Sequence, residues 1–424
     1  MGGLLLGIFA ALVVATVPIG FALATAASIA VVVANLPVII IPQQIVAGMD
    51  SFPMLAVPLF ILAGFLMDVG GISQRLVTLA RALVGHLPGG LGQVVIIAEI
   101  FFSGVSGSTS ADAAAIGGIM VPQLMANGYS RARSTAIGSA ACGLGILIPP
   151  AIVMVVYGVI GNVSVGALFV ASITPALLMA VGLMTQIGWQ ARREKWPTGE
   201  RATFAEVRHA AVAALLPLSL IVVILGGIRF GLFTPTEAAA LGALFCFLLV
   251  ACYGKLTWQV ITKSVAAATT ISVMVFVILT GSAAFSQILA FTGITVGITE
   301  LAFSWSEHPI LILIAMQVML LLLGMLIEQT SIVMITTPIY FPIVSAFGWD
   351  PVWFGAIMLL NLEMATISPP FGLSLFVMKG ITSKTTTMGD IYRAALPFVA
   401  LNLVVMGIMI AVPGTVLWLP ALMR

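Results

Sequence analysis

Apolar residues follow one another in unbroken runs along this chain, without the alternation of a half-buried strand. Runs of about 18 or more residues recur over the whole length, and each is long enough to cross a bilayer of ~30 Å. An example is AVAALLPLSLIVVILGG at 211–227. Such runs fit helices, which satisfy their own backbone groups, and not the alternating strands of a membrane barrel. The pattern predicts an all-α polytopic membrane protein with about ten spanning helices.

Small and hydroxyl-bearing residues interrupt one of these runs at 103–117, SGVSGSTSADAAAIG. Pro149 and Pro150 must break the helix expected at 134–160, because each proline lacks an N–H and clashes with the preceding turn. Irregular backbone at membrane depth survives only where protein or a water-filled cavity satisfies its polar groups. We therefore expect hydroxyl oxygens and freed carbonyls to converge on a monovalent cation such as sodium, although small residues also serve close helix packing. The oxygens are those of Ser103, Ser106, Ser108, Thr109, Gly143, Gly145 and Ile148.

The two halves of the chain resemble each other. With a shift of 220 residues and no gap, residues 104–150 align with 324–370. The Pro-Pro pair of LIPPA then meets that of ISPPF, with a glycine and a proline in register upstream: Gly104 with Gly324 and Pro122 with Pro342. The match predicts an internal repeat.

Basic residues orient the two halves, because Lys and Arg mark the cytoplasmic loops of helical membrane proteins. In the first half a single apolar region, 90–126, separates two basic loops and must therefore enter and leave on the cytoplasmic side as a re-entrant hairpin. The segments beside 309–346 carry Glu300, Glu307 and Asp350 but no Lys or Arg, so that hairpin must enter from outside. Two halves of opposite orientation are typical of secondary transporters. The basic loops lie at 75–81, 131–133, 192–208, 255–263 and 379–393.

We therefore divide the chain into two inverted repeats and expect both termini outside. The first, 1–209, comprises scaffold helices at 1–89, a hairpin at 90–126 and a broken helix at 134–160. The second, 210–424, comprises scaffold helices at 210–284, a hairpin at 309–346 and a broken helix at 352–378.

Acidic residues in the apolar runs have two interpretations. TSAD at 109–112 and TPTE at 234–237 each match a capping box, in which the acid three residues after the threonine closes a helix start. An acid within the membrane is also a candidate for transport. Asp112, Glu237, Glu328 and Glu363 remain candidates for both roles.

Composition excludes several classes of function. Only 7% of the 424 residues are charged, and the net charge of +2 includes no basic stripe, so we expect no nucleic-acid partner. His86, His209 and His308 lie far apart in sequence and pair with no nucleophile or second ligand at helical spacing. We therefore expect neither an enzyme, such as a membrane protease or lipid transferase, nor a cofactor.

Four motifs resemble the large membrane subunit of tripartite ATP-independent periplasmic (TRAP) transporters. They are GGIRFGLFTPTEAAA at 226–240, FFSGVSGSTSADAAAIGGIMVP at 101–122, GILIPP at 145–150 and ISPPFGLSLFVMKGI at 367–381. The resemblance covers nearly the whole chain. It implies an elevator-type, sodium-coupled importer of the bacterial inner membrane. Its partners would be a small four-helix membrane subunit on a separate chain and a periplasmic substrate-binding protein.

The resemblance also implies two sodium sites and a substrate site. The family's first sodium site falls on Ser103, Ser106, Gly145, Ile148 and Pro150. The second falls on Gly324, Ala365, Ser368 and the neighbouring Gly372 or Leu373, where EMATIS at 363–368 departs from the Gly and Thr of many members.

The family carries mostly organic acids, including dicarboxylates, keto acids and sialic acids. A carboxylate would be held by N–H groups at the hairpin tips. The substrate candidates there are Ser108, Thr109, Glu328 and Thr330. Proton coupling, with Asp112 or Glu363 as the carrier, is the alternative to sodium coupling.

Overall fold

The apolar runs form helices, because a helix satisfies its backbone hydrogen bonds without water. The computed structural model describes residues 2–293, 308–381 and 386–422, with residues 297, 300 and 304 and without the side chain of Ser110. The described elements of the first half are α1 (Gly2–Val14), α2 (Ile19–Val33), α3 (Ile40–Met49), the 3₁₀ helix η1 (Phe52–Leu55), α4 (Ala56–Val69), α5 (Ile72–Val84), α6 (Gly90–Ser106), α7 (Thr109–Asp112), the π-helical turn η2 (Ala113–Gly117), α8 (Gly118–Ala126), α9 (Arg131–Cys142), the 3₁₀ helix η3 (Gly143–Ile146), α10 (Ile152–Ile160) and α11 (Val165–Glu194).

The described part of the second half is likewise helical. Its elements are α12 (Phe204–Arg229), α13 (Pro235–Cys252), α14 (Trp258–Phe291), α16 (Pro309–Gly324), α17 (Gln329–Ala346), α18 (Pro351–Thr366), α19 (Leu373–Ile381), α20 (Met388–Ala411) and α21 (Gly414–Ala421).

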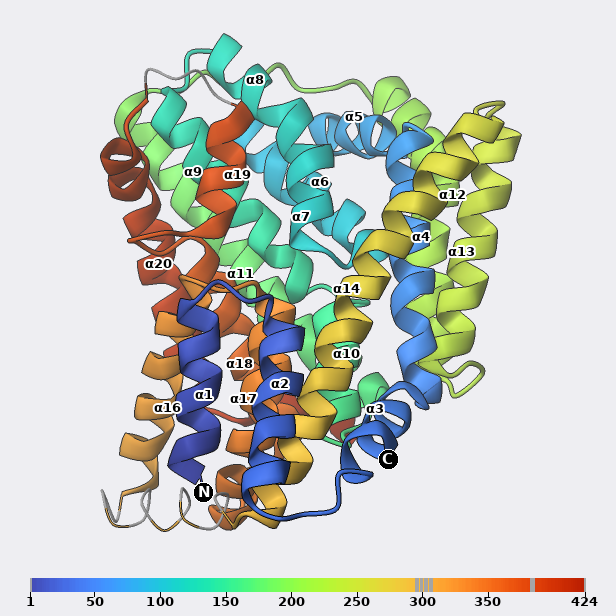
Figure 1. Ribbon diagram of the computed structural model, residues 1–424. Helices are drawn as coiled ribbons and strands as arrows, with labels where there is room; N and C mark the ends of the chain where they lie inside the picture. Colours follow the sequence, from blue (N-terminus) through green and yellow to red (C-terminus); the bar gives the residue numbers. More distant parts are fainter. Residues whose placement is uncertain are drawn as a thin grey trace.

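Six helices in the described ranges are long and apolar enough to cross a membrane, judged by length and composition. They are Phe52–Val69, which joins η1 to α4, and α11, α12, α13, α14 and α20. Two further paths run from one face of the molecule to the other in pieces, α9–η3–α10 and α18–α19 (Figure 1). The prolines stand in both breaks, and the bonds Pro149–Pro150 and Pro369–Pro370 are cis.

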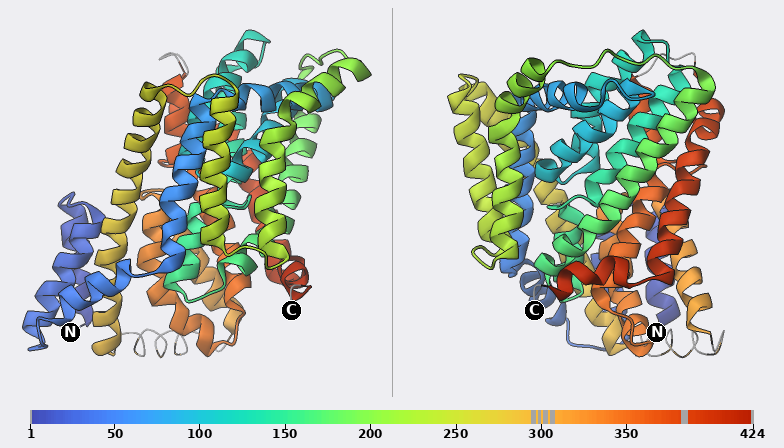
Figure 2. Two further views of the ribbon diagram at one scale, coloured as in Figure 1. Left: turned by 90° about the vertical axis from the view of Figure 1, so that its right-hand side faces the viewer. Right: turned by 180° about the vertical axis from the view of Figure 1, so that it is seen from behind.

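The described connections of the five predicted basic loops lie on one face, at the top of Figure 1, which we call the basic face. Arg229 is an exception, because it ends α12 and donates to the Leu422 carbonyl near the C-terminus. From the basic face α6 descends to the middle of the molecule, and α8 returns to it. In contrast, α16 rises from the opposite face, and α17 returns there. Both termini lie towards that opposite face (Figures 1 and 2).

The helix α14 separates peripheral helices from the helical hairpins. It packs against α2, α3 and α4 and also against α17. Figure 2 shows the pairs α1–α2 and α12–α13 at the periphery of the molecule. The α14 helix is therefore the wall that the hairpin tips face.

The amphipathic helix α5 lies along the basic face (Figure 1). Its buried positions include Ile72, Leu76 and Leu79, which share one side of the helix. The Arg75 guanidinium lies 3.9 Å from the centre of the Tyr253 ring, a cation–π contact. On the same helix, Arg81 donates a hydrogen bond to Gln123 of α8. This helix therefore contacts both the periphery and the first hairpin.

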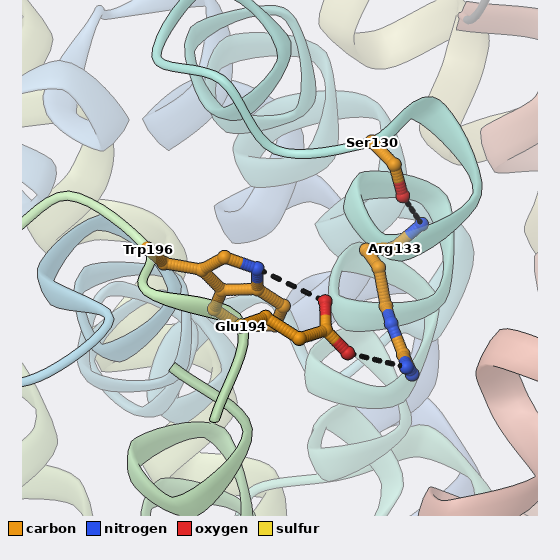
Figure 3. Close-up of polar contacts among 4 residues, drawn as sticks. All are labelled: Ser130, Arg133, Glu194 and Trp196. Carbon is orange, nitrogen blue, oxygen red and sulfur yellow. Dashed lines mark hydrogen bonds and ion pairs between the residues drawn. The ribbon is translucent and has the colours of Figure 1, made fainter. Parts of the chain in front are cut away.

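Polar contacts join α9 to the end of α11 on the basic face (Figure 3). Ser130 caps α9, and its hydroxyl accepts from the backbone N–H of Arg133 at 3.3 Å. The Arg133 guanidinium pairs with Glu194 at 2.8 Å, and the indole N–H of Trp196 donates to the same carboxylate at 3.1 Å. The contacts fix the connection that follows α11 beside the start of the broken helix.

Candidate functional site

The serines of the first hairpin converge on Asp112. Ser103 and Ser106 lie on the last turn of α6, which Gly107 ends in the left-handed conformation, with φ of 58°. The Ser103 hydroxyl lies 2.8 Å from Asp112 Oδ2, and the Ser106 hydroxyl donates to Asp112 Oδ1. Each of the three polar side chains is at most 2% exposed. The hairpin tip therefore holds a buried carboxylate surrounded by hydroxyl groups.

The role predicted for Thr109 in a capping box is wrong. Thr109 is the first residue of α7 and not the residue before it, so its side chain does not occupy the capping position. The Asp112 carboxylate instead binds the two serines that approach from the preceding helix. Local spacing favoured a cap, but the return of the chain brings α6 within reach of the same acid.

The broken helix α9–η3–α10 lies directly against this tip. A side chain on Gly145 would collide with the Asp112 carboxylate and lie 3.4 Å from the backbone nitrogen of Thr109. A side chain on Gly107 would collide with the Pro150 carbonyl, while Ile152 N–H donates to the Gly107 carbonyl at 3.2 Å. Glycine at these positions therefore allows close backbone approach. Ile148 lies between these contacts on the chain and is 8% exposed.

Glu99 joins this group, although the sequence reasoning missed it. Its carboxylate lies 3.1 Å from the Ser103 hydroxyl and 3.8 Å from the Cys142 sulfur, and it is completely buried. A signal was available, because Glu99 is the one acid in its apolar run and precedes Ser103 by one helical turn. Two carboxylates therefore lie beside the serines, where Asp112 alone was considered.

The residues predicted for the second sodium site also gather, around the other proline break. A side chain on Gly324 would collide with the Ala365 Cβ. Gly372, with φ of 61°, lies so that a side chain would be 3.1 Å from the Ser368 carbonyl. The Ser368 hydroxyl donates to the Met364 carbonyl at 2.7 Å. The oxygen atoms at this break thus belong to backbone carbonyls and to the Ser368 hydroxyl, whose hydrogen is donated to Met364.

Glu363 lies in α18, completely buried, with a different environment from Asp112. Neither carboxyl oxygen has a hydrogen-bond partner among the described residues. A side chain on Gly143 of η3 would collide with it, so the carboxyl group packs against the first broken helix. A lone buried carboxylate is costly in its charged form, whereas the Asp112 carboxylate accepts from hydroxyl groups.

The substrate candidates share a cavity of about 220 Å³ between the two hairpin tips and α14. Its polar wall contains Ser108, Thr109, Glu328 and Thr330, together with Gln329. The Thr109 hydroxyl donates to the Gln329 side-chain oxygen at 3.4 Å, so a contact joins the two halves at positions 220 residues apart. The sequence reasoning missed Gln329 and the α14 wall, which consists of Ile271, Met274, Val275 and Ile278.

Glu328 caps α17 at the second tip. Its carboxylate accepts from the Ser331 backbone N–H at 3.2 Å and from the Thr330 hydroxyl at 2.9 Å. It therefore lies at the edge of the cavity with part of its hydrogen-bonding capacity used.

Glu237 lies outside this group of residues. It closes the predicted capping box with Thr234, accepting from the Thr234 backbone N–H at 2.8 Å, and it is exposed. Its structural role is thus confirmed, and its contacts indicate no role in transport.

Two further cavities are lined in part by α14. One, of about 160 Å³, shares Ser108 and Ile271 with the central cavity and extends to α4. The other, of about 340 Å³, is lined by Leu279, Ser282 and Gln287 of α14 and by residues of α3 and α10. Residues 271–287 of α14 therefore contribute to the lining of three cavities, two of which share Ile271.

Comparison with known proteins identifies the family of the chain. Residues 6–415 match the family described as "Tripartite ATP-independent periplasmic transporter, DctM component". The C4-dicarboxylate TRAP transporter large permease protein DctM of Pseudomonas aeruginosa is 37% identical over 372 residues, covering 88% of this chain and 87% of that protein. The sialic acid TRAP transporter large permease protein SiaM of Vibrio cholerae is 34% identical over 418 residues, covering 97% of this chain and 96% of that protein.

A solved structure shares the fold. The crystal structure of the Alcanivorax borkumensis YdaH transporter, described as having an unusual topology, superposes with a TM-score of 0.67 at 14% sequence identity. The match covers 87% of each chain. The similarity to YdaH establishes the fold alone, while the family match extends over almost all of the sequence. The chain belongs to the family of tripartite ATP-independent periplasmic transporters, as its DctM component.

Proposed function

We propose that this chain imports an organic acid across the bacterial inner membrane, driven by a sodium gradient. The observation that carries the proposal is the convergence of two hairpin tips and the first proline-broken helix around one cavity, with the second broken helix packed against the second hairpin at Gly324. Discontinuous helices of this kind provide ion and substrate sites in secondary transporters. The hairpins 90–126 and 309–346 would be re-entrant, each inserted from its own side of the membrane.

The relatives support an acidic substrate and two partners. One is described as a permease for C4-dicarboxylates and the other as a permease for sialic acid, and both substrates carry carboxylates. The tripartite family description supports a periplasmic substrate-binding protein and a small membrane subunit, which we expect to have four helices. The substrate would reach the central cavity from that binding protein.

The first sodium ion would bind at Ser103, Ser106, Gly145, Ile148 and Pro150. Asp112 beside the serines supplies a negative charge, which favours a cation over a neutral ligand. The second would bind at Gly324, Ala365, Ser368 and Gly372, through backbone carbonyls. Because only the first site has this carboxylate, we expect electrostatic attraction to contribute more to sodium binding at the first site than at the second.

The hairpins and broken helices would move as one unit past α14, in an elevator mechanism. The three cavities along α14 support such a path. The Ser282 hydroxyl on α14 donates to the Met334 carbonyl of α17, so this pair bridges the proposed moving and fixed parts. A disulfide between Ser282→Cys and Met334→Cys should stop transport until it is reduced.

A matched pair within the fixed part provides the control. The Thr236 hydroxyl of α13 donates to the Phe52 carbonyl at 3.0 Å, and both belong to the proposed scaffold. Cross-linking Thr236→Cys to Phe52→Cys should leave uptake unchanged. Full uptake with α14 tied to α17 would contradict the elevator mechanism.

Proton coupling is a second candidate, favoured by the buried carboxyl group of Glu363, to which no described residue hydrogen-bonds. Uptake into proteoliposomes containing the permease and its partners, under a sodium gradient or a pH gradient, separates the two. Sodium coupling predicts accumulation with the sodium gradient alone. Accumulation driven by the pH gradient in the absence of sodium would contradict it.

A further inference from the structure

The wall of the central cavity that α14 provides is entirely aliphatic. Ile271, Met274, Val275 and Ile278 follow the spacing i, i+3, i+4 and i+7, so they share one side of the helix. Ile152 and other aliphatic residues of the first broken helix extend this wall. A ligand in the cavity therefore has a broad apolar surface against which carbon atoms can be buried.

Polar groups are confined to the hairpin tips, opposite α14. The Gln329 oxygen accepts from Thr109, which leaves the amide N–H groups as the donors of that side chain. Ser108 and Thr330 also line this end, where the Thr330 hydroxyl donates to Glu328 at 2.9 Å. The neutral donors of the Gln329 amide suit one carboxylate.

The only charged side chain among the described cavity residues is Glu328, and it is negative. Because the described lining contains no lysine or arginine, a second anionic group on the ligand would have no counter-charge there. Glu328 repels any carboxylate in the cavity, and each further negative charge on the ligand adds to that repulsion, because like charges interact strongly where water is scarce. The charge pattern therefore disfavours a dicarboxylate.

The cavity is also small. Sites for drug-sized ligands begin at about 300 Å³. The volume suits a short-chain acid better than a nine-carbon sugar acid.

We propose that this cavity selects a small aliphatic monocarboxylate. Its carboxylate lies at the hairpin tips and its alkyl body against Met274, Val275 and Ile278. Glu328 excludes a second carboxylate. The proposal rests on the proposed transport of an organic acid, and it narrows the substrate to one anionic group with a short hydrocarbon chain.

The test compares three acids on the full chain in lipid nanodiscs. Radiolabelled 4-methyl-2-oxopentanoate, succinate and N-acetylneuraminate are titrated with and without sodium. We expect saturable binding of 4-methyl-2-oxopentanoate, with an affinity at least about tenfold higher than that of either other acid. Equal or tighter binding of succinate or N-acetylneuraminate would overturn the proposal.

Two valines on α14 make a matched comparison. Val275 lines the cavity, whereas Val273 is 53% exposed on another side of the helix. Val275→Ala should weaken binding of 4-methyl-2-oxopentanoate about tenfold, because about two methylene equivalents are lost from the contact. Val273→Ala should leave binding unchanged. Equal effects of the two variants would contradict the apolar subsite, provided that both unfold at the wild-type temperature.

Glu328→Gln tests the exclusion of a second charge. It should improve succinate binding about tenfold or more, and unaltered discrimination would refute the role of Glu328. The sodium dependence of binding distinguishes the proposed selectivity from the proposed sodium coupling. Sodium-dependent binding of succinate alone would refute the selectivity and support the coupling. Sodium-independent binding of the monocarboxylate would support the selectivity and refute the coupling. Failure of all three acids to bind would contradict both.

Discussion

The two hairpin tips use their acidic residues in opposite ways. At the first tip, Asp112 lies inside the returning helix and binds Ser103 and Ser106 of the incoming one. At the second tip, Glu328 precedes the returning helix and caps it. The residues that follow the two turns, Thr109 and Gln329, are 220 positions apart and contact each other. Similar backbones thus carry one tip whose acid joins two helices and one whose acid stabilises a single helix end.

The two proline breaks also differ in the groups that lie beside them. At the first break Gly145 lies against the Asp112 carboxylate, whereas at the second break the corresponding Ala365 lies against Gly324 of α16. Glu363, the buried acid of the second broken helix, packs against Gly143 of the first, and no described residue hydrogen-bonds to its carboxyl group. The two breaks therefore resemble each other in backbone shape more than in the charged groups beside them.

The largest effect should follow from Asp112→Ala. The buried Ser106 hydroxyl would lose its acceptor, and that of Ser103 would keep only Glu99 at 3.1 Å. An unsatisfied buried group costs about 1–3 kcal/mol. We expect the free energy of unfolding to fall by about 2–4 kcal/mol and sodium-driven uptake to be lost. Glu328→Ala removes only a cap, worth about 0.5–2 kcal/mol. Thermal unfolding and uptake measure both, and equal losses of stability would refute the contrast between the tips.

Replacing the serines should have the next largest effect. Ser103→Ala with Ser106→Ala should lower sodium affinity about tenfold, at a cost of about 1 kcal/mol of stability for each hydroxyl. Ser368→Ala should lower it less than about threefold, because that hydroxyl donates within its own helix. The sodium dependence of uptake gives both values. A larger effect of Ser368→Ala would indicate that the second site contributes more of the sodium affinity.

The helical class and the family could be predicted from the sequence, because unbroken apolar runs and the Pro-Pro and FTPTEAA motifs are local signals. The partner of Asp112 could not, since the TSAD spacing fits a cap and only the return of the chain brings Ser103 to it. The cavity wall of α14 was also missed. Its apolar residues are indistinguishable in sequence from those that face lipid, and the hairpin tips that select one side of the helix are distant along the chain.

Glu363→Met should stabilise the protein slightly, by about 1 kcal/mol. An apolar side chain of similar length removes a buried carboxyl group without a described hydrogen-bond partner and so removes a desolvation cost. Glu99→Met should have the opposite sign, because it deletes a carboxylate beside the Ser103 hydroxyl. The melting temperatures of the two variants, measured in one detergent, test the difference. Destabilisation by Glu363→Met would show that its carboxyl group has a polar partner, such as a bound water.

The smallest effect should come from Arg133→Ala. With the shift of 220 residues, Arg133 corresponds to Trp353, and each side chain contacts the long helix that follows its broken helix. Trp353 is buried and its indole N–H donates to the Met409 carbonyl at 2.8 Å, whereas the Arg133 and Glu194 side chains are 24% and 37% exposed. Exposed ion pairs contribute about 0–1 kcal/mol. Arg133→Ala should therefore lower the free energy of unfolding by about 0.5 kcal/mol, less so at high salt, and leave uptake within about twofold of wild type. A loss above about 2 kcal/mol would mean that the exposed Arg133–Glu194 pair stabilises the first half as much as the buried Trp353–Met409 contact stabilises the second.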